Sequence, residues 1–192
     1  MRIHKALKDN GFHATFFYVY DLWGRKMNSA LEQEILQAQA NGFEIGNHTY
    51  THQSLKQLSA EEVRQEIGKN REFLSQLTGQ ENFLIRPPYL DVNQTVFDNA
   101  GAPLITCAVD TYDWNNATTA KDMVDLLTKK MNDGTLRTTI VLMHETYATT
   151  AEAVEKMAPV FKQNGWQVVT ISEMFKVNGQ IMKDGVVYTK AG

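Results

Sequence analysis

The 192-residue sequence lacks most features that mark a specialised class of protein. Its one cysteine, Cys107, excludes an intramolecular disulfide. Its formal net charge of −3 and its scattered Lys and Arg residues give no electrostatic case for a nucleic-acid partner. No apolar run reaches membrane-spanning length, and residues 1–8 do not form an apolar signal peptide. With 43% hydrophobic residues, the composition is that of an ordinary globular domain.

Glycines occur at the ends of segments whose apolar residues have helical spacing. A left-handed residue is favoured just after a helix. Helices are expected to end at Gly11, Gly42, Gly79, Gly101, Gly134 and Gly165. Apolar runs follow these glycines, and strands are expected over residues 14–20, 43–46, 83–86, 104–110, 139–143 and 167–171. The alternation predicts an α/β fold with a parallel sheet, open or closed into a barrel, in a single domain over residues 1–192. The tail, 177–192, is expected to form a hairpin around Lys183, Asp184 and Gly185.

Two histidines, His48 and His52, lie four residues apart just after the second expected strand. This spacing places two imidazoles on one face of a helical turn. Imidazole is a common metal ligand, and a metal there could polarise a carbonyl group or activate a water molecule. Two surface histidines would give the same pattern, and a typical catalytic zinc has three protein ligands. The function of this pair therefore depends on what the rest of the chain supplies.

Chemically competent side chains also follow the next three expected strands. They are Arg86 and Tyr89 after the third, Asp110, Asp113 and Trp114 after the fourth, and Leu142 and His144 at the end of the fifth. In a β/α barrel the carboxyl ends of the strands share the face that carries the active site. Taken singly, each residue also has a structural interpretation, such as an aspartate that caps a turn. Trp23 and Trp166 are interpreted as packing residues.

These segments together resemble the polysaccharide deacetylases, the NodB-homology or carbohydrate esterase family 4 group. Residues 48–52 resemble the family's H-[ST]-x-x-H motif, and residues 86–89 resemble R-x-P-Y. Residues 110–114 resemble D-x-x-D-W, and residues 142–144 resemble L-x-H. Residues 14–17 match the A-T-F-F strand. The resemblance implies a distorted (β/α) barrel of the NodB type and metal-dependent removal of acetyl groups from sugar polymers.

The resemblance also implies which residues bind the metal and the oxyanion. His48 and His52 would hold a divalent metal, with Zn²⁺ or Co²⁺ expected. Tyr89 would offer its backbone N–H to the oxyanion of the tetrahedral intermediate and would contact the substrate. An electrophile and oxyanion donors are what acyl transfer requires.

The remaining implied roles concern the proton and the acetyl group. His144 would be the general acid that protonates the leaving amine, and Asp113 would orient it. Arg86 would hold the catalytic aspartate through a charged hydrogen bond. Trp114 and Leu142 would wall the acetyl pocket.

One family motif is absent from this sequence. The family opens with T-F-D-D-G on its first strand, where one aspartate is the general base and the other is the third metal ligand; no Asp-Asp pair occurs in these 192 residues. We therefore expect a chain truncated at its N-terminus, missing the first strand, and impaired as a catalyst. The alternative is a non-catalytic, carbohydrate-binding relic of the same fold. A zinc peptidase is less favoured, because the HExxH glutamate is absent.

The expected partner is a polysaccharide. Peptidoglycan N-acetylglucosamine is preferred over chitin-type oligomers, and xylan acetyl esters come last, by analogy with the family. The resemblance implies an extracellular or cell-envelope location. A missing first strand would leave unpaired edges at residues 14–20 and 167–171, through which the chain could dimerise.

Overall fold

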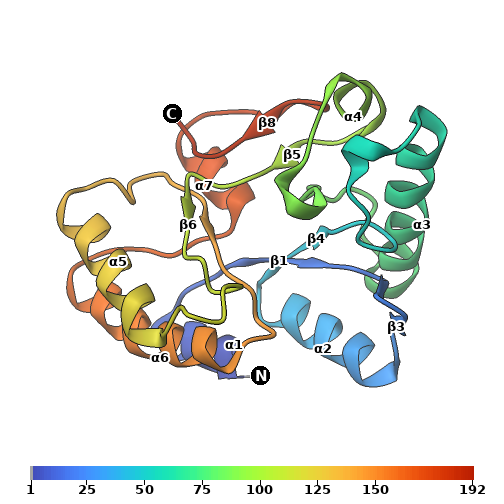
Figure 1. Ribbon diagram of the computed structural model, residues 1–192. Coiled ribbons are helices and arrows are strands. Elements are labelled where there is room, and N and C mark those ends of the chain that lie inside the picture. Colours follow the sequence, from blue (N-terminus) through green and yellow to red (C-terminus); the bar gives the residue numbers. More distant parts are fainter. Residues whose placement is uncertain (1) are drawn as a thin grey trace. The chain divides into compact units, whose positions relative to one another are not determined.

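The computed structural model describes residues 2–192, which divide into two compact units built from separate stretches of chain (Figure 1). The first unit takes the chain up to Ala14, together with Cys107–Asn178 and Thr189–Gly192. The second unit takes Thr15–Thr106 and Gly179–Tyr188. None of the helices in this described part of the chain combines the length and the apolar character that a bilayer span requires. A single domain over residues 1–192 stays a prediction.

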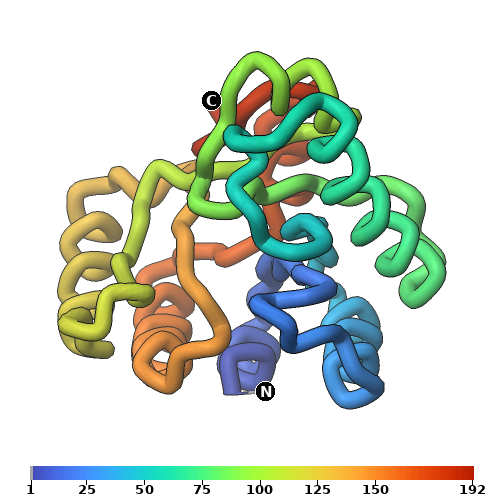
Figure 2. Tube along the Cα trace, turned by 45° about the vertical axis from the view of Figure 1, so that its right-hand side comes forward, coloured from blue at the N-terminus to red at the C-terminus, as the bar shows by residue number. Residues whose placement is uncertain are grey.

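The first unit is mainly helical. Its elements are α1 (Arg2–Asn10), β6 (Val109–Asp110), α5 (Ala120–Asn132), β7 (Val141–Leu142), α6 (Ala148–Gln163) and α7 (Ile171–Val177). Strands β6 and β7 pair in parallel, and α6 packs against both α1 and α5, so that the three helices lie side by side in Figure 2. A core cluster that includes Val109, Leu127 and Met157 joins β6 to the two longer helices. This packing fixes the ends of β6 and β7, which carry the polar residues of this unit.

The second unit contains most of the parallel sheet. Its strands are β1 (Thr15–Tyr18), β2 (Asp21–Leu22), β3 (Arg25–Lys26), β4 (Glu44–Asn47), β5 (Leu104–Ile105) and β8 (Val187–Tyr188). Its helical elements are α2 (Ser29–Ala40), η1 (Leu55–Gln57), α3 (Ala60–Thr78), η2 (Pro88–Leu90) and α4 (Gln94–Asn99). β1 pairs in parallel with β4, and β5 pairs in parallel with β8. Single parallel bridges at Ile85, one to Asn47 and one to Leu104, connect the two pairs.

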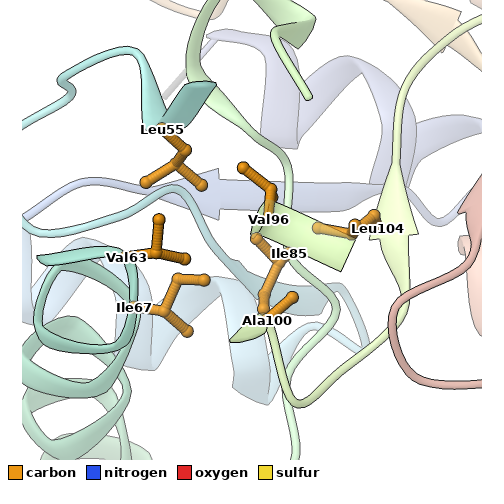
Figure 3. Packing of buried hydrophobic residues seen from close by; sticks show 7 residues of the cluster. All are labelled: Leu55, Val63, Ile67, Ile85, Val96, Ala100 and Leu104. Atoms are coloured by element: carbon orange, nitrogen blue, oxygen red, sulfur yellow. The ribbon is translucent and has the colours of Figure 1, made fainter. Parts of the chain in front are cut away.

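An aliphatic cluster holds this sheet against its helices. It contains Leu55, Val63, Ile67, Ile85, Val96, Ala100 and Leu104, whose side chains converge in Figure 3. Burial of each large aliphatic side chain stabilises a fold by about 1.5–3 kcal/mol. The longest helix in the cluster, α3, begins at a capping box formed by Ser59 and Glu62 and ends at Gly79, a left-handed residue. The cluster positions α3 beside the end of β4, where the first candidate residues lie.

The left-handed glycines predicted at the helix ends are confirmed. All six glycines expected at helix ends have positive φ angles, between 61° and 81°. The expected strand over residues 104–110 is divided, however, because β5 pairs with β8 whereas β6 pairs with β7.

Two expected elements are wrong. Residues 167–171 form no strand: Val168 accepts one hydrogen bond from His13, and a capping box between Thr170 and Glu173 starts α7 at Ile171. The tail forms no hairpin, because β8 pairs with a strand made much earlier in the chain. Only the turn itself is present, and its Gly185 has a φ of 70°.

Gly185 offers a test of how the tail docks. A Cβ atom at Gly185 would lie 2.3 Å from the carbonyl oxygen of Phe97 in α4, whereas a Cβ atom at Gly179 would meet nothing within 4 Å. Both glycines have left-handed φ angles, of 70° and 67°. Gly179→Ala should therefore lower the free energy of unfolding only by the cost of that conformation, about 1–2 kcal/mol. Gly185→Ala should lose about 1–3 kcal/mol more, measured by urea denaturation, because of the clash. Equal losses would contradict the docking of the tail on α4.

Candidate active site

The loop after β4 carries His48 and His52, and it is not the helical turn that the spacing predicted. Thr49 and His52 have φ angles of 69° and 61°, which lie in the left-handed region. The buried carboxylate of Glu66 in α3 fixes this shape. It accepts hydrogen bonds from the backbone N–H groups of Tyr50 (3.1 Å) and Thr51 (2.8 Å) and from the Thr51 hydroxyl group (2.7 Å). The helical expectation fails because these donors bond to a side chain rather than to a preceding carbonyl group.

Two buried asparagines anchor the same loop to the sheet. Asn47 Oδ1 accepts hydrogen bonds from the Thr49 N–H (2.9 Å) and from Asn70 Nδ2 (2.8 Å). Asn70 Nδ2 also lies 2.8 Å from the carbonyl oxygen of Tyr18, the last residue of β1. Buried amides whose groups are satisfied in this way hold a loop in one conformation. The loop is therefore held by both β1 and α3.

The two imidazole rings face each other. Their Nε2 atoms are 3.2 Å apart, and the ring planes are inclined by 84°. His48 Nδ1 lies 2.6 Å from the carbonyl oxygen of Arg86, so Nδ1 carries the proton and Nε2 presents a lone pair toward His52.

This donor set fits a transition metal such as Zn²⁺ or Co²⁺. Zinc takes nitrogen ligands at about 2.0–2.1 Å with tetrahedral geometry, and two nitrogens 3.2 Å apart are compatible with two such ligands. Across residues 2–192, His, Cys, Asp and Glu side chains assemble no group of three that could hold a metal ion. The pair alone is therefore one ligand short of the three protein ligands of a typical catalytic zinc.

Arg86 and Tyr89 lie beside this histidine pair. The Arg86 guanidinium group lies over the Phe17 ring, 4.4 Å from its centroid. Its backbone N–H donates to the Asn47 carbonyl oxygen (3.0 Å), and its own carbonyl group accepts from His48. Tyr89 has a left-handed φ of 57° in η2, and its exposed ring meets the His52 ring at 5.1 Å. The backbone contribution of Arg86 to the orientation of His48 was not predicted from the sequence.

Trp23 was predicted to be a packing residue, and this prediction is wrong. Trp23 occupies the turn between β2 and β3 and is 73% exposed. Its ring lies 5.9 Å from the His52 ring, edge to face. The sequence offered a signal in the following residue, Gly24, because a glycine in a short polar segment marks a tight turn whose side chains face solvent.

The first unit holds a second polar group, built around Asp113. The Asp113 side chain is fully buried, and its Oδ1 lies 2.7 Å from His144 Nδ1. Its Oδ2 accepts hydrogen bonds from the His144 backbone N–H (2.6 Å) and from the hydroxyl group of Thr150 in α6 (2.7 Å). The carboxylate therefore keeps a proton on His144 Nδ1, and Nε2 is the ring nitrogen that does not face Asp113. Thr150 carries no sequence signal for this role, since its partner lies far away in the chain.

The environment of Asp113 changes its titration. Burial acts to raise the pKa of Asp113, but hydrogen bonds from the His144 ring and backbone, the Thr150 hydroxyl group and the charge of His144 together hold it below its ordinary value. Asp113 is therefore a carboxylate at neutral pH.

Trp114 follows Asp113 in the loop after β6, and Leu142 is the last residue of β7. Trp114 is half-exposed, with its ring 5.8 Å from the Tyr112 ring. Asp110 accepts hydrogen bonds from the backbone N–H of Tyr112 (2.8 Å) and from the indole N–H of Trp114 (3.2 Å), and the second of these orients the Trp114 ring. Leu142 is buried, and its carbonyl group accepts from the hydroxyl group of Thr111 (2.9 Å). Asp110 therefore acts as the turn cap that its structural interpretation suggested.

The predicted site residues thus form two groups. His48, His52, Arg86 and Tyr89 lie together in the second unit, and Asp113, Trp114, Leu142 and His144 lie in the first unit. The residues that sequence reasoning missed are Asn47, Glu66 and Asn70 behind the first group and Thr150 behind the second.

Comparison with known proteins gives a consistent picture. The sequence model of the family described as polysaccharide deacetylase matches residues 1–108. Peptidoglycan-N-acetylglucosamine deacetylase PgdA of Listeria monocytogenes is 32% identical over 180 residues, which cover 93% of this chain and 36% of that protein. The chain thus spans about a third of the length of this curated relative.

Solved structures extend the likeness to the fold. A family 4 acetyl xylan esterase from Clostridium thermocellum, in complex with a cobalt ion, matches with a TM-score of 0.86 and 25% identity, over 98% of this chain and 90% of that one. A mutant of a family 4 pseudoenzyme with restored enzymatic activity matches with a TM-score of 0.74 and 28% identity, over 90% of this chain and 61% of that one. The predicted fold class, a distorted (β/α) barrel of the NodB type, is confirmed by these structures.

Asp113→Asn should change how stability depends on pH. Because the folded-state pKa of Asp113 is lowered, its contribution is present above the unfolded value of about 3.9 and is lost as the pH falls through the folded value. At pH 7 the substitution should cost about 1.5–3 kcal/mol, since charged hydrogen bonds become neutral ones. Urea denaturation should also show a shallower fall in stability below about pH 4 than in the wild type. Asp110→Asn, at a partly exposed carboxylate, serves as the control, and an unchanged acid slope in Asp113→Asn would contradict the assignment.

Proposed function

This chain belongs to the polysaccharide deacetylase family, and on that premise we propose that it removes acetyl groups from a cell-wall polysaccharide with the help of a divalent metal. The observation that carries the proposal is the pair of imidazole nitrogens, 3.2 Å apart, at the end of β4. The oriented pair of Asp113 and His144 supports the proposal independently.

The substrate that we favour is N-acetylglucosamine in peptidoglycan. PgdA of Listeria monocytogenes bears that activity in its name and is 32% identical to this chain. Chitin-type oligomers carry the same N-acetyl group and come next, whereas xylan acetyl esters are the substrate class of the matched esterase. A peptidoglycan substrate implies an extracellular or cell-envelope location.

His48 and His52 would hold the metal, and Arg86 would keep His48 in the tautomer that metal binding requires. When bound, a metal of this kind supplies a Lewis acid that polarises the acetyl carbonyl and lowers the pKa of a bound water molecule.

The chain's own residues would act on the proton and the oxyanion. Hydrolysis forms a C–O bond to water and breaks the C–N bond, and the leaving nitrogen must gain a proton. His144 Nε2 would donate that proton, because Asp113 holds the ring through Nδ1. The Tyr89 N–H would stabilise the oxyanion, and Trp114 and Leu142 would contact the acetyl methyl group.

The base is the weak point of this chain as a catalyst. The 192 residues contain no Asp-Asp pair, so the aspartate that would activate the water molecule is missing from them. General-base help is worth roughly 10²–10⁴-fold, and we expect turnover to be lower by that amount. A chain that only binds carbohydrate is the second candidate, and the matched family 4 pseudoenzyme favours keeping it.

The predicted dimer through strand edges stays a prediction, which sedimentation analysis would test.

The metal site is testable by calorimetry. His48→Ala and His52→Ala should each weaken Zn²⁺ binding by at least about 100-fold, because each removes one of two facing ligands. His13→Ala removes a histidine of the first unit that pairs with Glu173, and it should leave the affinity unchanged. Equal Zn²⁺ affinity in all three variants and the wild type would place the metal elsewhere.

The reaction is testable through the release of free amines from N-acetylglucosamine oligomers. His144→Ala should lower the rate about 10²–10⁴-fold through loss of the general acid, with Zn²⁺ affinity unchanged. A wild-type chain that binds the oligomers and releases no amine would favour the carbohydrate-binding alternative. A rate that His144→Ala leaves intact would remove His144 from the mechanism.

A further inference from the structure

A histidine lies on the buried face of α1. The buried residues of this helix are Ile3, His4 and Leu7, and His4 is only 5% exposed. α1 packs against α6 within the first unit. Aliphatic side chains suit a buried helix face, whereas a polar ring there needs a polar partner to offset its loss of water.

The carboxylate of Glu145 faces this ring. His4 Nε2 lies 3.7 Å from Glu145 Oε2, which is too far for a hydrogen bond but close enough for an ion pair when the ring is protonated. Both atoms are shielded from water. Oε2 accepts no hydrogen bond from the described residues, so the imidazole is the group in position to compensate the charge of this buried oxygen.

Glu145 directly follows His144, in a loop that its own residues hold weakly. The loop joins β7 to α6, and the side chain of Tyr147, at the N-cap of α6, caps none of the described N–H groups there. By contrast, α3, α5 and α7 each begin at a capping box. The Tyr147 N–H reaches the His144 carbonyl oxygen only at 3.5 Å. Contacts with other segments therefore determine the conformation of this loop.

Two such contacts act on adjacent residues. Asp113, in the loop after β6, binds both the ring and the backbone N–H of His144. His4, on α1, faces the side chain of Glu145. Because the two loop residues share a peptide bond, a backbone shift at Glu145 would displace the His144 ring from Asp113. Displacement of a reacting group by about 1 Å can lower a rate by about 10²-fold.

We propose that Glu145, through its pairing with His4, is a positioning residue for His144. The inference rests on the proposed function, in which His144 is the general acid, and it adds α1 to the elements that direct the proton-donating ring. The pair takes no part in proton transfer and acts by holding the loop. Its loss should therefore lower the turnover number and leave substrate affinity unchanged.

NMR spectroscopy tests the pair without relying on turnover. The Nδ1–H signal of His144, identified by its absence from His144→Ala, is followed by hydrogen exchange in the wild type, Glu145→Gln, His4→Leu and the double variant. Each single variant should exchange this proton about tenfold faster, because the ring leaves Asp113 more often. The double variant should exchange it no faster than either single variant, as expected for two residues that act as a pair. An unchanged exchange rate in Glu145→Gln would contradict the inference.

Glu155→Gln is the matched control. Glu155 on α6 pairs with Arg2 on α1 at 2.6 Å, so this ion pair also joins the two helices, but it is exposed. The substitution should leave the exchange rate of the His144 proton unchanged. An equal acceleration in Glu155→Gln would mean that any loosening of α1 from α6 frees the ring, and the specific role of Glu145 would be lost.

Amine release from N-acetylglucosamine oligomers supplies a second readout. Glu145→Gln should lower kcat about tenfold with KM unchanged, and it should have no further effect in the His144→Ala background, because it acts through that ring. The same loss in both backgrounds would reveal a purely structural role and overturn the inference.

Urea denaturation separates a loss of folding from a loss of positioning. If a single variant does not fold, the double variant, which removes both members of the buried pair, carries the test. A folded but less stable variant whose His144 proton exchanges at the wild-type rate would count against positioning. If the wild type releases no amine while the exchange rates change as expected, the proposed function fails and the positioning of His144 by the pair is still supported.

Discussion

The carboxylate of Glu66 is the constraint on which the candidate metal site depends. It is buried on α3 and accepts three hydrogen bonds from Tyr50 and Thr51, the residues between the two histidines. Without it, three donors of this loop would lose their acceptor, and leaving such a group unpaired costs about 1–3 kcal/mol. With these hydrogen bonds the loop adopts a conformation in which Thr49 and His52 are left-handed. In that conformation the Nε2 atoms of His48 and His52 lie close together. The helix that supplies Glu66 is in turn positioned by the aliphatic cluster of the second unit.

The two groups of candidate site residues orient a histidine ring in the same way. In each, an acceptor holds the Nδ1–H of a histidine: the Arg86 carbonyl oxygen for His48 and the Asp113 carboxylate for His144. Both histidines therefore present Nε2 as the reactive atom. The acceptors differ in charge, and this difference suits the two assigned roles. A neutral carbonyl group faces the ring proposed as a metal ligand, whereas a carboxylate faces the ring proposed as the general acid.

The sequence was most informative where one residue determines one local conformation. The six glycines predicted the helix ends because only glycine adopts a left-handed conformation without steric cost. The histidine spacing and the residues at the strand ends identified the candidate site residues. The sequence was least informative where a residue acts through a partner that is distant in the chain. Glu66 looked like an ordinary helix residue, and the pairing of β5 with β8 joins Leu104 to Val187, which lie far apart in the sequence. Residues 167–171 looked like a strand because their apolar run is β-like, but the capping box at Thr170 commits the end of that run to a helix.

The division of the chain into interleaved units has a consequence for its synthesis. Residues 179–188 complete the second unit by pairing with β5, and residues 189–192 return to the first unit, where the Ala191 N–H donates to the Thr138 carbonyl oxygen (2.8 Å). Neither unit has all of its residues while this segment is still inside the ribosome. The edge of β5 that pairs with β8 therefore stays unpaired until Val187 and Tyr188 emerge.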